Sequence, residues 1–231
     1  MPKLQRVPEA NVEYAYGIYL LSNKHRLIKT MKKRYQPSIH GHRTWGAGYL
    51  LMDYLSHNGI RRGARAMEIG CGWGQVSVFC AREFKARMTA VDLDSAVFPF
   101  ADVLAELNAV EIKTLQADFN KLKGAQLAQQ RYLVGSDICF WDSMVDPLAR
   151  LVNRAIKAGV ERVVITDPGR PTFYEFCEKM AKKHDTKLQE WYAIEPERFE
   201  GEVIDIRPRK GAQGAAKKPA KKSKKSTKTK S

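Results

Sequence analysis

Three glycines at alternate positions, Gly70, Gly72 and Gly74, follow an apolar segment and precede a segment with helical character. Glycine is needed where a strand turns sharply into a helix and where a ligand must approach the backbone closely. Asp92 ends the next apolar segment. A carboxylate in that position is placed to accept hydrogen bonds from a ribose diol. Together these features predict a binding site for a ligand that contains a nucleoside.

The neighbours of the glycines distinguish between two classes of nucleoside cofactor. A dinucleotide-binding loop has the pattern GxGxxG, and Gln75 stands where that pattern requires its third glycine. Glu68 lies two residues before Gly70. A carboxylate at this place repels a pyrophosphate, but it can bind the ammonium group of an amino-acid-like ligand directly or through water. The loop therefore favours S-adenosylmethionine over NAD.

From residue 64 onward, short apolar segments alternate with helical segments, which is typical of an α/β fold with a parallel sheet covered on both faces. In such a sheet the carboxyl ends of the strands meet at one edge, where ligands bind. The segments 186–194 and 199–206 are joined so closely that an antiparallel pair is expected. The expected strands are 65–69, 88–92, 112–115, 137–141 and 162–166, and the expected helices are 75–84, 95–108, 147–157 and 171–183.

Two further helices are expected before the first strand. Ser22 is placed to cap a basic helix that reaches about Arg34, and this helix is either a substrate surface or a solvated face. Residues 49–55 predict an amphipathic helix. His40 and His42 have the spacing of a metal-binding pair, but no nearby Cys or carboxylate completes a site. We expect no metal here, and instead a lid or wall of the cofactor pocket.

The composition divides the chain into an N-terminal helical extension (1–40), a folded domain (41–207) and a disordered Lys-rich tail (208–231). From Lys210 onward there are nine lysines, no acidic residue and no apolar residue larger than alanine, and these lysines carry more than half of the net charge of +15. Such a segment cannot fold alone. It either contacts nucleic acid or ribosomes electrostatically or serves as a solubilising tail.

The cysteines and the apolar segments indicate the compartment. Four cysteines are spread widely with no CxxC pair, which suits buried thiols in a reducing compartment. No apolar run approaches the roughly 20 residues that a membrane helix requires, and no signal peptide is expected. We therefore expect a cytoplasmic protein that makes no membrane contact.

Three motifs in order give a family resemblance over about residues 40–206. Residues 68–74 resemble motif I of the class I, seven-strand S-adenosylmethionine-dependent methyltransferases, residues 91–94 their second motif, and residues 116–119 their third. The resemblance implies a Rossmann-like, mostly parallel seven-stranded sheet with helices on both faces and an antiparallel last strand. The residues expected to bind S-adenosylmethionine are Trp45, Glu68, Gly70, Cys71, Gly72, Gly74, Asp92, Leu93, Asp118 and Phe119.

The resemblance also implies individual roles. In this family the acid that matches Asp92 binds the ribose hydroxyls, and the acid that matches Asp118 receives the adenine amino group. Leu93 and Phe119 are expected to flank the adenine ring. Asp118 has a second interpretation, as the cap of the segment after the third strand. Cys71 is expected to be a small packing residue and not a nucleophile.

The segment after the fourth strand decides the acceptor. Enzymes that methylate an exocyclic amine of a nucleobase commonly carry [DN]PP[YF] here, and residues 137–147 do not contain it. Residues 45–51 and 91–99 instead resemble the branch of seven-strand protein methyltransferases that modify lysine. That branch has the pattern Asp, two residues, Tyr, Asp after its fourth strand. The resemblance therefore favours a protein substrate.

Residues 142–146 match that pattern except that Val145 stands in the aromatic position. Trp141 or Trp45 can supply the aromatic wall that suits an alkylated ammonium. We therefore expect Asp142 and Trp141 to be the catalytic residues, with Asp142 orienting the acceptor amine or receiving its proton. Asp142 has a second interpretation, as a turn residue before the next helix.

The predicted function is S-adenosylmethionine-dependent methyl transfer to a protein nitrogen, with lysine as the acceptor. A sulfonium is already activated, so positioning and desolvation supply most of the rate, and no nucleophilic triad is expected. Two alternatives stay open. One is a small-molecule methyltransferase, and the other is a nucleic-acid- or ribosome-associated protein that works through its basic tail.

Overall fold

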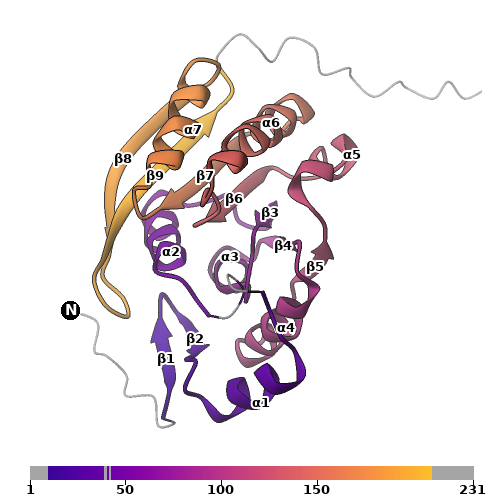
Figure 1. The fold of residues 1–231 in the computed structure, drawn as a ribbon, viewed down its shortest axis with the longest axis vertical. Helices are drawn as coiled ribbons and strands as arrows, with labels where there is room; N and C mark the ends of the chain where they lie inside the picture. The colour runs from indigo at the N-terminus through magenta and orange to yellow at the C-terminus, as the bar shows by residue number, and fades with distance from the viewer. Residues whose placement is uncertain (1–9, 39–40, 42, 210–231) are drawn as a thin grey trace, which may run out of the picture.

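The computed structural model describes residues 10–38, 41 and 43–209, which form a seven-stranded sheet with helices on both sides and a separate two-stranded hairpin (Figure 1). The strands are β1 (Val12–Ala15), β2 (Ile18–Leu21), β3 (Arg65–Ile69), β4 (Arg87–Asp92), β5 (Lys113–Gln116), β6 (Tyr132–Ser136), β7 (Arg162–Asp167), β8 (Asp185–Ala193) and β9 (Phe199–Arg207). The helices are α1 (Arg26–Arg34), α2 (Gly46–Asn58), α3 (Gln75–Phe84), α4 (Phe98–Leu107), α5 (Gly124–Leu127), α6 (Asp142–Ala158) and α7 (Pro171–Ala181).

The strand order is β5-β4-β3-β6-β7-β9-β8. Pairing is parallel from β5 to β7, while β9 runs antiparallel to both β7 and β8. The predicted fold class, with its antiparallel last strand, is therefore confirmed. Because β3 pairs with β4 on one side and with β6 on the other, the chain reverses its direction of travel across the sheet at β3. A crevice opens at such a switch point, outside the carboxyl ends of the strands.

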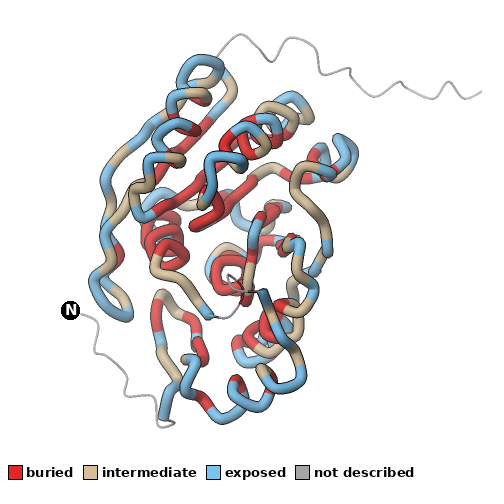
Figure 2. Tube along the Cα trace, in the orientation of Figure 1, coloured by how far each residue is buried: buried red, intermediate tan, exposed pale blue. Residues whose placement is uncertain are grey.

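Successive side chains of the strands alternate between two cores, as the pleat requires. Ala66 of β3 and Val134 of β6 pack in the core under α2, α3 and α4. Their neighbours Met67 and Leu133 pack in the core under α6 and α7. Figure 2 shows the central strands β3, β6 and β7 and the inward helix faces as largely buried, whereas the edge strands β5 and β8 are mostly exposed. The sheet is thus held on both faces, and its edge with the carboxyl ends is fixed in place.

The fourth parallel strand differs from its expected position. β6 covers residues 132–136 and not 137–141, and α6 begins at Asp142 and not near residue 147. The strand ends because Asp137 has a φ of 56°, a left-handed conformation that no strand residue adopts. The apolar residues 138–141 misled the prediction, since they belong to the following loop.

The segments before β3 differ in three ways from expectation. The residues before the basic helix include an unpredicted hairpin, β1–β2. The helix α1 begins at Arg26, and it is capped by His25, whose Nδ1 accepts the N–H of Leu27 over 3.3 Å, and not by Ser22. α2 is not amphipathic, since residues 47–55 are all buried. It packs on β7, β8 and β9 and against α3, which leaves it little contact with solvent.

In the part of the chain that the structure describes, no helix is both long and apolar enough to cross a membrane. The Lys-rich tail from residue 210 onward lies outside the described residues, as do His40 and His42.

Candidate functional site

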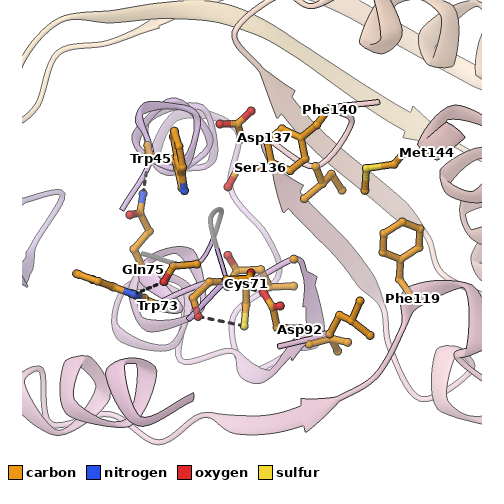
Figure 3. A pocket seen from close by; sticks show the side chains of 18 of the residues that line it. Trp45, Cys71, Trp73, Gln75, Asp92, Phe119, Ser136, Asp137, Phe140 and Met144 are labelled. Carbon is orange, nitrogen blue, oxygen red and sulfur yellow. Dashed lines mark hydrogen bonds between the residues drawn. The ribbon is translucent and has the colours of Figure 1, made fainter. Parts of the chain in front are cut away.

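A cavity of about 260 Å³ lies at the carboxyl ends of β3, β4, β5 and β6 (Figure 3). The expected site residues that line it are Trp45, Glu68, Gly70, Cys71, Gly72, Asp92, Leu93, Asp118, Phe119 and Trp141. Two expected residues, Gly74 and Asp142, are not among its lining residues. The sheet therefore brings together residues that lie far apart in the sequence.

The glycines of the loop, Gly70, Gly72 and Gly74, all have positive φ angles, and a different constraint requires glycine at each position. At Gly70 an added Cβ would lie 2.5 Å from Cγ2 of Ile138, so the glycine lets the loop after β6 pack against it. At Gly72, with a φ of 50°, a Cβ would meet nothing within 4 Å, so its backbone conformation is the reason. At Gly74 a Cβ would lie 3.1 Å from that of Ala101, so this glycine serves the packing of α3 on α4.

Asp92 ends β4 with both carboxylate oxygens fixed. Oδ2 accepts the backbone N–H of Gly72 over 2.9 Å, and Oδ1 accepts that of Asp94 over 3.0 Å. Burial raises the pKa of Asp92, and these two hydrogen bonds act in the opposite direction. Each oxygen of a carboxylate has a second lone pair, so each can accept one further hydrogen bond. The donor set of a ribose diol fits this arrangement.

Glu68 reaches the cavity wall from β3 but is almost completely buried. Its Oε2 accepts hydrogen bonds from the backbone N–H of Ser77, over 2.8 Å, and from the Ser77 hydroxyl. Burial raises the pKa of Glu68 to about 8, against the effect of both hydrogen bonds, and the charge of Asp92 adds to the increase. A ligand ammonium group near this carboxyl group would favour its ionised form.

Asp118 and Phe119 follow β5, the strand that pairs with β4, so they lie on the rim next to the end of β4. Oδ1 of Asp118 accepts the N–H of Asn120 over 2.8 Å and so caps the short 3-10 segment Phe119–Lys121. The capping interpretation of Asp118 is confirmed, and the residue also lines the cavity, where its contact with adenine stays a prediction. Leu93 lies on the same rim with 67% of its surface exposed, which leaves an apolar face open to a flat ring.

The residues before α2 close another side of the cavity. Nε1 of Trp73 donates to the carbonyl oxygen of Gly41 over 2.8 Å, and Nε2 of Gln75 donates to that of Trp45 over 3.3 Å (Figure 3). Trp73 itself is buried and stacks on Phe100, with ring centroids 4.8 Å apart. The glycine loop therefore anchors the segment that carries Trp45.

Cys71 is 5% exposed, and burial raises the pKa of its thiol well above the ordinary value. A thiol held in its protonated form is a weak nucleophile, so packing explains this residue. Among the residues that the structure describes, no three His, Cys, Asp or Glu side chains gather closely enough to hold a metal ion.

The remaining wall of the cavity comes from the loop between β6 and α6. Ile138 lies over two glycines, since a Cβ on Gly70 or Gly135 would come within 2.5 Å or 2.8 Å of it. This contact turns the loop so that Asp137 and Phe140 line the cavity, and Figure 3 shows both on the side away from Asp92. The carboxylate that directly follows the fourth parallel strand is therefore that of Asp137.

Asp137 and Phe140 line the cavity, although the sequence did not predict them as site residues. Asp142, which was expected in this place, is the exposed first residue of α6. Val145, expected in the aromatic position, is buried in the core of the sheet's second face. The pair Gly135-Ser136 at the end of β6 was the available signal, because small and polar residues mark the end of an apolar strand.

Comparison with known proteins gives a family match for this part of the chain. A family profile described as a methyltransferase domain matches residues 66–159. Two curated proteins named electron transfer flavoprotein beta subunit lysine methyltransferase are similar in sequence. The Xenopus laevis protein is 28% identical over 130 residues, which is 56% of this chain and 52% of that protein. The human protein is 25% identical over 167 residues, which is 68% of this chain and 58% of that protein. The chain thus spans little more than half the length of these relatives.

Solved structures share the fold. A methyltransferase from Pyrococcus furiosus has a TM-score of 0.55 at 14% identity, and the match covers 69% of this chain and 83% of that one. The human methyltransferase 10 domain containing protein has a TM-score of 0.54 at 11% identity, with 78% and 93% covered. At these identities the likeness shows the fold alone.

Proposed function

We propose that this chain, which carries a domain of the class I, S-adenosylmethionine-dependent methyltransferase family, transfers a methyl group to a protein nitrogen, the side-chain amine of a lysine. The observation that carries the proposal is the pair Asp137 and Phe140 on the cavity wall opposite Asp92. S-adenosylmethionine is the methyl donor of this family, and the lining residues fit it. When bound, it supplies a methyl group that its sulfonium activates toward a nitrogen nucleophile.

The proposed cofactor residues divide by the part of the ligand that each suits. Asp92, with a free lone pair on each oxygen, would hold the ribose diol. Asp118, Leu93 and Phe119 would hold adenine, since they combine one acceptor with two apolar side chains. Glu68 and the backbone of the glycine loop would hold the methionine portion, where the ligand ammonium group compensates a buried carboxylate.

The proposed acceptor residues are Asp137, Phe140 and Trp141. A lysine amine attacks only in its neutral form, so the site must orient the amine and accept or relay its proton. The carboxylate of Asp137 can accept an amine N–H, and aromatic faces attract the ammonium forms that precede and follow transfer. Asp137 and Phe140 also reproduce the spacing of Asp and Tyr in the lysine-modifying branch. We therefore assign to Asp137 the role first expected of Asp142.

The two curated relatives are named as lysine methyltransferases, and this supports the same acceptor class. Their identities are low and their chains are longer, so the support concerns the class of acceptor and not a particular substrate protein.

The test is incubation of the full chain with S-adenosylmethionine labelled in its methyl group and a cell extract, followed by separation of protein, RNA and small molecules. We expect label in protein that is recovered as methyllysine after hydrolysis. Asp92→Ala should reduce this label when S-adenosylmethionine is below saturation. Label confined to RNA or to small molecules would overturn the lysine proposal, and the second result would favour a small-molecule methyltransferase.

A further inference from the structure

We infer that Arg170, at the start of α7, is a positioning residue that sets the acceptor wall by holding Asp137 and Phe140 together. The inference rests on the proposed function for its catalytic meaning. Arg170 is not among the residues that line the cavity, and it belongs to none of the sequence motifs discussed above.

Arg170 bridges two carboxylates that follow neighbouring strands. Its Nη1 forms an ion pair with Oδ1 of Asp137, after β6, and another with Oδ2 of Asp167, the last residue of β7, over 2.9 Å. The side chain of Asp167 is fully buried and that of Asp137 is 7% exposed. Oδ1 of Asp167 also accepts the backbone N–H groups of Gly169 and Arg170, over 2.9 Å and 2.8 Å. Asp167 therefore fixes the position of the guanidinium group, and the guanidinium group in turn binds Asp137.

The same guanidinium group lies over the ring of Phe140, with Cζ 5.0 Å from the ring centroid. One side chain thus contacts both acceptor residues of the wall, the carboxylate and the aromatic ring. Two further hydrogen bonds hold the loop after β6. The N–H of Asp137 donates to the carbonyl oxygen of Thr166 in β7 over 2.8 Å, and the hydroxyl of Thr172 in α7 donates to that of Cys139. The end of β7, the loop after it and the start of α7 therefore all contact the loop after β6.

The contacts with Arg170 and Thr166 stabilise the backbone of Asp137, whose φ of 56° is strained for a residue with a side chain. Such a conformation persists only where the surroundings determine it. The ion pair also selects the oxygen that is left for the acceptor. Arg170 occupies Oδ1, and no residue in the described part of the chain donates a hydrogen bond to Oδ2. In the inferred arrangement Oδ2 is the oxygen that accepts the N–H of the incoming amine.

One guanidinium group faces two carboxylates here, so the cluster of Asp137, Asp167 and Arg170 behind the acceptor wall keeps a net negative charge when both carboxylates are ionised. A cationic lysine is attracted to such a wall, whereas a neutral or anionic acceptor is not. Arg170 thereby limits the repulsion between Asp137 and Asp167 without cancelling the charge that attracts the substrate.

The experiment compares Arg170→Met, which keeps the length of the side chain and removes its charge, with Arg170→Lys and with the control Arg131→Met. Arg131 pairs with Glu161 at the opposite edge of the sheet, and its side chain is 37% exposed. For Arg170→Met we expect kcat/KM for protein labelling to fall about 10- to 100-fold, since a misplaced group costs this much, while the Kd for S-adenosylhomocysteine stays within about 2-fold. Arg170→Lys should recover part of the loss, and Arg131→Met should behave as wild type.

Hydrogen exchange of the amides of residues 138–141 provides a readout that needs no acceptor. These amides should exchange at least about 10-fold faster in Arg170→Met than in wild type, with the amides of α3 unchanged. Wild-type exchange and wild-type labelling in Arg170→Met would overturn the inference. An equal loss of S-adenosylhomocysteine affinity and a general rise in exchange would also overturn it, because they indicate a merely structural role. If wild type labels no protein, the proposed function fails, and the exchange data still decide the role of Arg170.

Discussion

The carboxylate of Asp92 accepts a hydrogen bond from the backbone N–H of Gly72 over 2.9 Å, so the end of β4 holds the glycine loop that follows β3. The second oxygen accepts the N–H of Asp94, and the orientation of the group is therefore set before a ligand arrives. A preorganised acceptor loses little conformational freedom on binding, which favours affinity.

Asp92→Ala should weaken the binding of S-adenosylhomocysteine about 10- to 150-fold, since hydrogen bonds to a charged group contribute roughly 1.5–3 kcal/mol. Isothermal titration calorimetry measures this change. The matched control is Asp102→Ala, on the exposed face of α4. An Asp92→Ala protein that binds as tightly as wild type would remove this residue from the site.

Gly70→Ala should destabilise the fold more than Gly59→Ala, although both positions have nearly the same φ, 62° and 59°. A Cβ at Gly59 meets nothing within 4 Å, whereas one at Gly70 would lie 2.5 Å from Ile138. Gly59 has a ψ of 166°, so Gly59→Ala carries a backbone cost of its own. The overlap with Ile138 is expected to add about 1–3 kcal/mol to the cost of Gly70→Ala. Chemical denaturation measures both free energies of unfolding. A loss at Gly70 no larger than the roughly 1–2 kcal/mol of a left-handed backbone alone would show that Ile138 moves away at no cost.

Glu68 should make the free energy of unfolding fall as the pH rises. Its folded-state pKa is about 8 against an ordinary value of 4.5, so between these values the folded protein keeps a proton that the unfolded chain releases. The stabilisation by the protonated carboxyl group is fully present below the unfolded-state pKa of 4.5, and it is lost as the pH rises through the folded-state pKa of about 8. Glu68→Gln, which cannot titrate, should show a shallower decrease, by up to about 1.4 kcal/mol per pH unit. Identical pH slopes in urea denaturation of the two proteins would contradict this account.

Local pattern predicted which residues after β3 and β4 line the cavity, with the exception of Gly74. The glycine spacing, Glu68 and Asp92 lie at the ends of two strands whose short apolar runs are bounded by turn residues. Strand ends at the same sheet edge must meet, so the sequence order alone placed these residues together. The positive φ of Gly70 could likewise be anticipated, because no other residue adopts it so readily.

The acceptor half could not be predicted in the same way. The apolar run from Tyr132 is interrupted at residues 135–137 and resumes from Ile138 to Trp141. Periodicity cannot tell which of the two short runs is the strand and which is a buried loop. β6 ends because Ile138 packs against Gly70 and Gly135 and because Arg170 forms an ion pair with Asp137. Both are tertiary contacts, the second between residues 33 positions apart, and no local signal encodes them.

The central claim is that Asp137, and not Asp142, orients the acceptor amine. Its most direct test is the rate of methyl transfer to protein by Asp137→Asn and Asp142→Asn, each with its affinity for S-adenosylhomocysteine measured in parallel. We predict that Asp137→Asn loses about 100-fold or more in kcat/KM, in the range of general acid–base effects, with affinity retained. Asp142→Asn, at an exposed position, should stay within about 2-fold of wild type. Full activity in Asp137→Asn together with a large loss in Asp142→Asn would contradict the account.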